Sequence, residues 1–424
     1  MKKHSYTDIF VVGFALFSMF FGAGNVVFPP FLGMSAGQNW LTGLVCYYIA
    51  DIGLAILAML SMFKRGGVNA ILSPAGRIPA TILMCATVLC IGPMLAIPRT
   101  AAMTFETSIE PLIPSVGSVV FSIAFFILVF LCSVRESAVV DIVGKVMTPL
   151  LLIGLLVLII KGAVNPLGEI NPVPHAANVA GDGIKAGYQT MDVLATLVFG
   201  GLILKSAHEK GYTEEKEKGS IAIKSGLVAG AILLIVYTGL THLGATVSSV
   251  YDLSMGRSSL MLAIVEGLMG QKGTVLYALV VALACITTAI GLVSSCAEYF
   301  ANLFKGKISY AVLVFIICLF SAIVSNVGLD MLISIAAPVL DVVYPPILVL
   351  IALSFLPQQK KGVYFASTLC AVIMSSITAI SVYGNISMPF LKLLPFDHLG
   401  FNWLVPSIIA AFIGYFINFK EEKA

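Results

Sequence analysis

The sequence predicts an all-α polytopic membrane protein of twelve transmembrane helices. Of its 424 residues, 59% are hydrophobic and only 11% are charged, and the mean hydropathy is +1.03. A typical soluble domain carries about 25% charged residues. Apolar runs long enough for a membrane-spanning helix, about 20 residues, recur along the whole chain. The lipid bilayer is therefore the expected surrounding, and neither a nucleic acid nor an obligate protein partner is indicated.

The candidate spans are joined mostly by short loops, and no soluble domain is inserted between them. Their approximate ranges are 8–32, 40–63, 79–105, 115–133, 144–163, 186–207, 222–246, 273–301, 308–325, 329–356, 362–384 and 402–419. If the N-terminus lies in the cytoplasm, the inner segments hold 18 of the 24 lysine and arginine residues and the outer segments hold five. Loops rich in these residues stay inside. This asymmetry predicts a multi-pass protein of the cell membrane with both termini in the cytoplasm.

The first span contains residues that a plain membrane anchor has no reason to carry. The stretch Met19–Pro30 includes two glycines, an asparagine and a pair of prolines. In a helix, glycine costs about 1 kcal/mol and proline about 3 kcal/mol relative to alanine. We expect the helix to break at Gly22-Ala23-Gly24 and to resume near Asn25. Its unpaired N–H groups and positive dipole end would then face the membrane midplane, where a carboxylate can bind.

The alternative is a tight contact between helices, which small residues also favour. Packing alone does not require the asparagine or the paired prolines, so we favour a binding site.

A similar glycine motif occurs five spans later. Phe199-Gly200-Gly201 lies in the middle of the sixth span and resembles the Phe-Gly-Ala-Gly of the first. Because five is odd, the two spans run in opposite directions, as in an inverted repeat that binds its ligand between two broken helices. We predict one repeat over residues 1–163, a second over 164–356, and two additional spans with a short tail over 357–424.

The eighth span contains a possible cation site. Ala284, Thr287 and Thr288 are spaced i, i+3 and i+4, so they share one face of a helix. They offer a carbonyl and two hydroxyl oxygens, which suit a hard monovalent cation such as Na⁺, and carbonyls freed at the break in the first span could complete its shell. Threonine hydroxyls also commonly bond back to their own helix. The spacing alone leaves both interpretations open.

Several ionisable residues lie within or near the spans. Arg99 follows Pro98 in the third span, and an intramembrane arginine is a functional candidate by default. Asp192 and Glu106 are its possible partners, in a pair that either gates the site or is structural. Three other acids keep a proton-coupled mechanism open: Asp51, Glu298 and Asp341.

Other classes of function find little support in the sequence. The cysteines and histidines match no metal-ligand spacing, and no nucleophile–base constellation predicts an enzyme. No ring of charges or filter repeat predicts a channel. No cofactor beyond a coupling ion is expected. The outer connection 248–272 contains an apolar stretch near Ser259–Leu268, which predicts a short helix that is either an outer lid or an interfacial element.

Four motifs together resemble a known family. Gly22-Ala23-Gly24-Asn25 and Phe28-Pro29-Pro30 in the first span, with Ile91-Gly92-Pro93 and Ile97-Pro98-Arg99-Thr100 in the third, look like the bacterial branched-chain amino acid:cation symporters. The resemblance covers essentially the whole chain. It implies membership of the amino acid–polyamine–organocation superfamily and a LeuT-like fold of five-plus-five inverted repeats with broken helices 1 and 6. It also implies import of leucine, isoleucine and valine driven by Na⁺ or H⁺.

The resemblance further implies roles for individual residues. The residues expected to bind substrate are Gly22, Ala23, Gly24, Asn25, Phe199 and Gly200. The expected Na⁺ ligands are Ser18, Phe21, Ala284, Thr287 and Thr288. The Ala-x-x-Thr-Thr pattern agrees with that of sodium-coupled members, which favours Na⁺. The alternative is a proton-coupled transporter or an exchanger of another small neutral solute.

Overall fold

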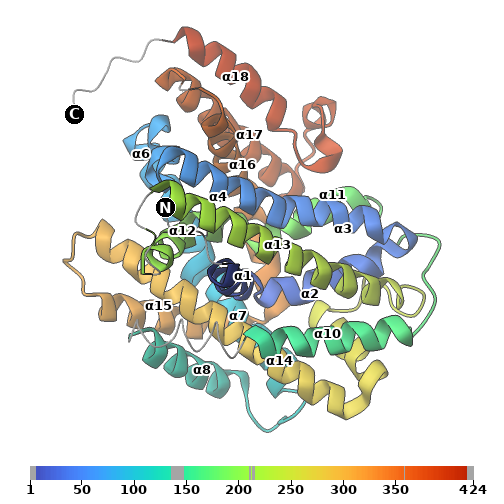
Figure 1. Cartoon of the computed structure of the whole chain (residues 1–424). Coiled ribbons are helices and arrows are strands. Elements are labelled where there is room, and N and C mark those ends of the chain that lie inside the picture. The colour runs from blue at the N-terminus through green and yellow to red at the C-terminus, as the bar shows by residue number, and fades with distance from the viewer. Residues whose placement is uncertain (1–5, 135–147, 210–211, 213–214, 358, 418–424) are drawn as a thin grey trace.

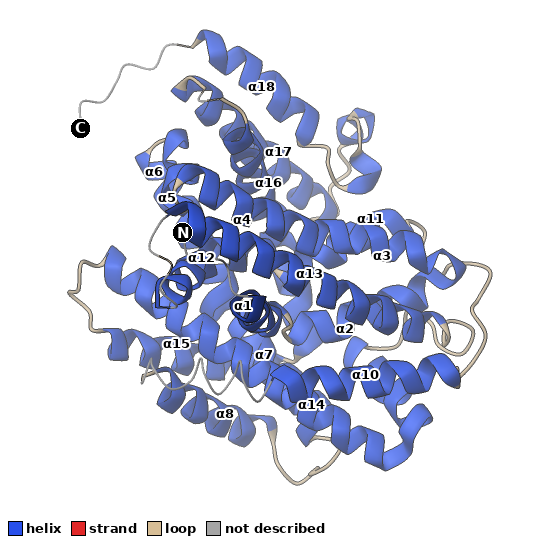
Figure 2. Cartoon of the chain, in the orientation of Figure 1, coloured by secondary structure: helices blue, strands red, loops and turns tan. Residues whose placement is uncertain are grey.

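The computed structural model describes residues 6–134, 148–209, 212, 215–357 and 359–417. Figure 2 shows helices and loops throughout this part of the chain, with no strand among the described residues. The helices are α1 (Tyr6–Phe20), α2 (Ala23–Ala36), α3 (Trp40–Tyr48), α4 (Leu54–Arg65), α5 (Val68–Leu72), α6 (Arg77–Leu89), α7 (Ala96–Thr104), α8 (Ser118–Ser133), α10 (Thr148–Val164), α11 (Val179–Thr190), α12 (Asp192–Glu209), α13 (Glu215–Ala245), α14 (Arg257–Leu303), α15 (Tyr310–Val324), α16 (Leu329–Phe355), α17 (Lys361–Tyr383) and α18 (Leu404–Phe416).

Within the described residues, seven helical stretches are long and apolar enough to cross a membrane, and four shorter apolar helices accompany them. The predicted all-α membrane fold is therefore confirmed. Figure 1 shows α1 near the middle of the bundle, while α17 and α18 lie at its periphery. The prediction that the last two spans are an addition to the core stays a prediction.

The first span is broken where the sequence predicts. α1 ends at Phe20, α2 begins at Ala23, and Gly22 between them has an extended backbone (φ −108°, ψ −164°). The break is therefore centred on Phe21 and Gly22, and Gly24 already belongs to the first turn of α2. The paired prolines do not end the helix, because α2 continues through them to Ala36.

The sixth span is also broken, but not at the predicted glycines. Helix α11 ends at Thr190 and α12 begins at Asp192, with Met191 between them in the left-handed region (φ 68°). The prediction of a break at Phe199-Gly200-Gly201 is wrong, since these residues lie inside α12. Gly200 serves close packing instead: a Cβ there would lie 2.2 Å from the terminal carbon of Met62 on α4.

Three π-helical turns interrupt the second and third spans. They are η2 (Ile49–Gly53), η4 (Cys90–Met94) and η5 (Phe105–Ile109). Within η4, Gly92 has non-helical torsion angles, and Pro93 after it has no N–H to donate. Asp51 lies in η2 and Glu106 in η5, so both acids occupy irregular turns of the kind often found at functional sites.

Helix α14 is kinked at Gly270 (φ 60°), and the segment before the kink contains the predicted helix at Ser259–Leu268. Two polar contacts hold the start of this segment. Arg257 forms an ion pair with Asp330 on α16 (2.8 Å), and Ser258 donates a hydrogen bond to Glu106 (2.6 Å). The Arg257 guanidinium also lies over the ring of Phe31 on α2, 4.6 Å from its centroid. The segment is thus fastened to α2, η5 and α16.

The contact between α2 and α13 gives a testable prediction. A Cβ added at Gly244 would lie 1.8 Å from the carbonyl oxygen of Pro30, and one added at Gly33 would lie 1.9 Å from that of Thr241. Neither backbone can yield without moving a helix. Gly244→Ala should therefore cost more than the roughly 1–3 kcal/mol of ordinary overpacking. Thermal unfolding of the detergent-solubilised protein measures this loss of stability.

Gly117→Ala is the matched control, because no atom lies within 4 Å of the Cβ that it adds. An unfolding temperature equal for both variants would contradict the close contact.

Candidate functional site

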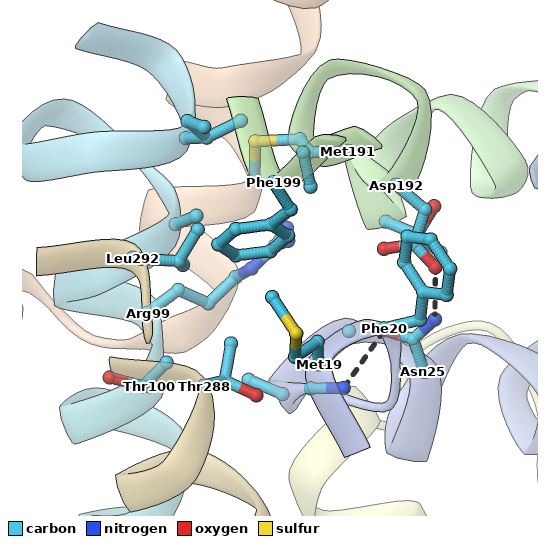
Figure 3. Close-up of a pocket in the computed structure, with 17 residues that line it drawn as sticks. Met19, Phe20, Asn25, Arg99, Thr100, Met191, Asp192, Phe199, Thr288 and Leu292 are labelled. Atoms are coloured by element: carbon cyan, nitrogen blue, oxygen red, sulfur yellow. Dashed lines mark hydrogen bonds between the residues drawn. The ribbon is translucent and has the colours of Figure 1, made fainter. Parts of the chain in front are cut away.

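The two helix breaks meet at a cavity in the centre of the bundle. Figure 3 shows its lining, to which the α1–α2 break, the η4–α7 region, the α11–α12 break and α14 all contribute. Its volume is about 30 Å³. That is room for about two water molecules, at roughly 10–15 Å³ each. An amino acid therefore enters only if the lining side chains move apart.

One end of the cavity carries positive charge. Arg99 on α7 is only 3% exposed, and its Nε and Nη1 atoms have no hydrogen-bond partner. Its Nη2 atom lies 3.3 Å from the point that a Cβ on Gly24 would occupy, at the N-terminus of α2. The first N–H groups of a helix lack partners and carry partial positive charge. A guanidinium and a helix N-terminus thus converge on the same space.

Asp192, at the start of α12, lines the same cavity. In Figure 3, Asp192 and Arg99 lie on opposite sides of the cavity. Its Oδ2 atom accepts a hydrogen bond from Asn25 (3.1 Å), whose own Oδ1 accepts one from the Gly22 N–H (3.3 Å). Asn25 therefore caps α2 and at the same time holds Asp192 in place.

Neither predicted partner forms an ion pair with Arg99. Asp192 is bonded to Asn25, as described above. Glu106 accepts hydrogen bonds from Ser258 (2.6 Å) and from the backbone N–H of Leu329 (2.7 Å). The charges of Arg99 and Asp192 are therefore both available to a ligand in the cavity.

The wall between the charged groups is mainly apolar. It includes the side chains of Met19 and Phe20 at the end of α1, Phe199 on α12 and Leu292 on α14. Phe20 and Phe199 are 4% and 1% exposed, so water is largely excluded from this part of the site. The lining suits a small aliphatic group.

The predicted cation ligands are only partly brought to the cavity. Thr288 lines it beside Gly22, and its buried hydroxyl has no hydrogen-bond partner. Thr287 instead donates to the carbonyl of Ala284 (2.9 Å), so the back-bonding alternative holds for this residue. Ser18 lies in the last turn of α1 and Phe21 in the break, where carbonyl groups lack partners within the helix.

Most of the other predicted site residues lie together. The cavity lining includes Gly22, Ala23, Gly24, Asn25, Arg99, Asp192 and Phe199. Gly200 is not among the lining residues, because it faces Met62. Sequence reasoning missed Thr190 and Met191, which form the break in the sixth span. The polar residues Gln189, Thr190 and Asp192 within an apolar stretch were the available signal.

The family of this chain follows from comparison with known proteins. Residues 5–421 match the family model described as "Branched-chain amino acid transport protein". The chain belongs to this family. Its members are transport proteins and not enzymes.

Curated relatives match over nearly their whole length. The chain is 32% identical to the branched-chain amino acid permease BraB of Bacillus subtilis (strain 168), covering 98% of this chain and 97% of the relative. It is 36% identical to the branched-chain amino acid transport system 3 carrier protein of Pseudomonas aeruginosa, covering 95% and 94%. These relatives agree with the family assignment, and the aligned region covers almost the whole length of each relative.

Solved structures share the fold at low sequence identity. A Na⁺-coupled sialic acid symporter in a substrate-bound outward-open state matches with a TM-score of 0.62 at 12% identity, over 96% of this chain and 89% of that one. MhsT in complex with L-phenylalanine matches with a TM-score of 0.57 at 18% identity, over 96% and 98%. The LeuT-like fold with broken helices 1 and 6 is confirmed.

Gly24 provides a direct test of the site. A Cβ there would lie 2.9 Å from the Phe28 ring and 3.3 Å from Arg99 Nη2, so a larger side chain would fill the positively charged end. We expect Gly24→Leu to insert and fold but to bind no amino acid, measured by binding of labelled leucine to the purified protein.

Gly291→Ala is the control, since its added Cβ would have no neighbour nearer than 3.9 Å and should leave binding unchanged. Normal leucine binding by Gly24→Leu would place the substrate elsewhere.

Proposed function

We propose that the transporter is a secondary active symporter that imports leucine, isoleucine and valine, coupled to a sodium gradient, by alternating access. The observation that carries this proposal is a buried cavity with a free guanidinium, a carboxylate and an apolar wall. A zwitterionic aliphatic amino acid has the matching groups. The names of the relatives support branched-chain amino acids as the substrate class.

The substrate carboxylate would bind Arg99 and the N–H groups at the start of α2. Arginine suits this role because its planar, permanently charged fork binds a carboxylate bidentately. The ammonium group would face Asp192, and the aliphatic side chain would pack against Phe20, Phe199 and Leu292. In this arrangement Arg99 and Asp192 each contact a charged group of the substrate. They do not form a gate that closes when the two side chains pair with each other.

The sodium ion would bind beside the substrate, between the break in the first span and α14. The unpartnered Thr288 hydroxyl next to Gly22 is the observation that supports this position. The carbonyls of Ser18, Phe21 and Ala284 and the hydroxyl of Thr287 would complete the shell, Thr287 after turning from its bond to Ala284. A cation at this point would bring together the broken first span and α14, so its binding would favour a closed substrate site.

For the membrane topology and the two inverted repeats, we propose the arrangement that the sequence predicts. Both termini would lie in the cytoplasm of a cell-membrane protein, and residues 1–163 and 164–356 would form the inverted repeats. The presence of one break in α1–α2 and another in α11–α12 supports this division. Two basic residues at the end of α4, Lys64 and Arg65, donate to the last carbonyls of α16, which would place that end of the bundle inside.

Uptake of labelled leucine into proteoliposomes tests the function. We expect accumulation with an inward sodium gradient, little without it, and competition by unlabelled isoleucine and valine. Uptake that is unaffected by sodium would remove sodium coupling from the proposal, and uptake that none of the three amino acids inhibits would remove the substrate class.

Arg99→Gln tests the carboxylate contact. Loss of one partner of a buried charge pair typically costs 2–5 kcal/mol, so affinity for leucine should fall about 30-fold or more. The aliphatic amine formed by decarboxylating leucine should compete no worse in the variant than in the wild type. Arg77→Gln, at an exposed position, is the control. An equal loss of affinity for the amine would indicate general damage and not a lost carboxylate contact.

Thr288→Val tests the sodium site. Losing a hydrogen-bonding or ligating oxygen to a charged group costs about 1.5–3 kcal/mol. The sodium concentration for half-maximal uptake should therefore rise about tenfold or more. Thr238→Val is the control, because the Thr238 hydroxyl only bonds back to Leu234 (2.7 Å). The same sodium dependence in Thr288→Val and wild type would exclude Thr288 as a ligand.

A further inference from the structure

Basic side chains gather where the end of α4, the end of α16 and the start of α17 meet. Lys64 and Arg65 are the last residues of α4, Lys360 is the residue before α17, and Lys361 is its first residue. We call these four residues the basic patch. Lys64, Lys360 and Lys361 are exposed, and Arg65 is half-buried. The patch borders the periphery of the bundle, where Figure 1 shows α17 and α18.

Hydrogen bonds bring the two halves of the patch together. Lys64 Nζ donates to the carbonyl of Phe355 (2.7 Å), and Arg65 Nη2 donates to that of Leu356 (2.7 Å). Lys360 follows Leu356 by four residues, a path of at most about 14 Å. The end of α4 and the start of α17 therefore place their charges in one small region.

The protein does not balance the charge of the patch. Helices α4, α5, α6, α17 and α18 contain no aspartate or glutamate. Within the part of the chain that the structure describes, none of the four side chains forms an ion pair. The C-terminus of α16, which Lys64 and Arg65 contact, contributes roughly −0.5 of an elementary charge. Most of the four positive charges therefore remain for a partner.

An exposed apolar surface adjoins the patch. Lys360 Nζ lies 4.3 Å from the centroid of the Tyr415 ring, near the end of α18. On the same helix, Phe412 and Phe416 are 70% and 80% exposed. In a protein that crosses a membrane, such apolar side chains lie against acyl chains, and tyrosine is enriched at the level of the lipid headgroups. The patch thus lies at headgroup depth beside a surface that acyl chains can cover.

We propose that the basic patch binds the anionic headgroup of a phospholipid, whose acyl chains lie along the exposed face of α18. The ammonium groups of Lys360 and Lys361 would donate to the phosphate oxygens. Lys64 and Arg65, which are bound to the end of α16, would add attraction without leaving their carbonyl partners. A soluble anion would gain the same charge contacts, but only a phospholipid would also cover Phe412 and Phe416.

This lipid site goes beyond the proposed function, because its occupancy requires neither an amino acid nor sodium. Each basic residue near an anionic lipid surface strengthens binding about fivefold. Removing two of the four charges should therefore weaken binding about 25-fold. A bound lipid would also contact the joint between the ends of α4 and α16, so it should raise the unfolding temperature of the protein.

Native mass spectrometry of the full-length protein in a neutral detergent, titrated with phosphatidylglycerol, tests the site. The dissociation constant should rise about 25-fold in the double variant Lys360→Gln/Lys361→Gln. Lys305→Gln/Lys307→Gln is the matched control: it removes the same charge from exposed positions between α14 and α15, and its dissociation constant should stay within about twofold of the wild type. Phosphatidylcholine, which has no net charge, should bind all three proteins equally weakly.

Thermal unfolding in the same detergent gives a second readout. Phosphatidylglycerol should raise the unfolding temperature of the wild type and of the control but not that of Lys360→Gln/Lys361→Gln, and without lipid all three should unfold at the same temperature. Equal loss of binding in both double variants, or equal binding of the two lipids by the wild type, would overturn the proposal. Displacement of the lipid by an equal concentration of inorganic phosphate would also overturn it, in favour of a soluble anion.

Discussion

The structure depends on one constraint: two stretches of backbone are left without helical hydrogen bonds in the middle of a protein that crosses a membrane. Exposed to lipid, each unpaired group would cost several kcal/mol. Here both breaks face each other across a buried cavity, where side chains supply the missing partners. Asn25 caps the N–H of Gly22, and Thr190 bonds near the end of α11. The unpaired groups that remain are the ones that a ligand can use.

Close packing of the surrounding helices holds the two helix breaks in position relative to each other. At Gly33 and Gly244 the backbones of α2 and α13 touch, so that no side chain of any size fits between them. Gly200 similarly lets Met62 of α4 reach α12. Without a hydrophobic driving force between helices in lipid, such contacts of small residues are a main source of association. Glycine in this chain thus serves two purposes, freeing the backbone at Gly22 and admitting a neighbour elsewhere.

Two buried charges line the cavity without pairing with each other. Arg99 and Asp192 line the same cavity from different sides, and Asp51 accepts a hydrogen bond from Thr190 at the end of α11. A direct Arg99–Asp192 pair would neutralise both groups and leave little for a ligand. Because Asp192 is bonded to Asn25 and forms no ion pair with Arg99, the guanidinium has no charged partner at the start of α2. A single asparagine, Asn25, connects Asp192 in the cavity lining to the first helix break.

The sequence by itself determined the membrane class and the break in the first span, and it singled out Arg99, which the structure places in the cavity lining, because hydropathy, glycine and intramembrane charge are local signals. The sequence misplaced the break in the sixth span. A glycine pair looks the same in a sequence whether it interrupts a helix or makes room for a neighbouring side chain, here that of Met62. Only the tertiary structure decided that Met191 adopts the left-handed conformation, that Glu106 is held by Ser258 and Leu329, and that Asp51 accepts a hydrogen bond from Thr190. These are contacts between residues far apart in the chain, and no local pattern encodes which of several acids a distant helix will reach.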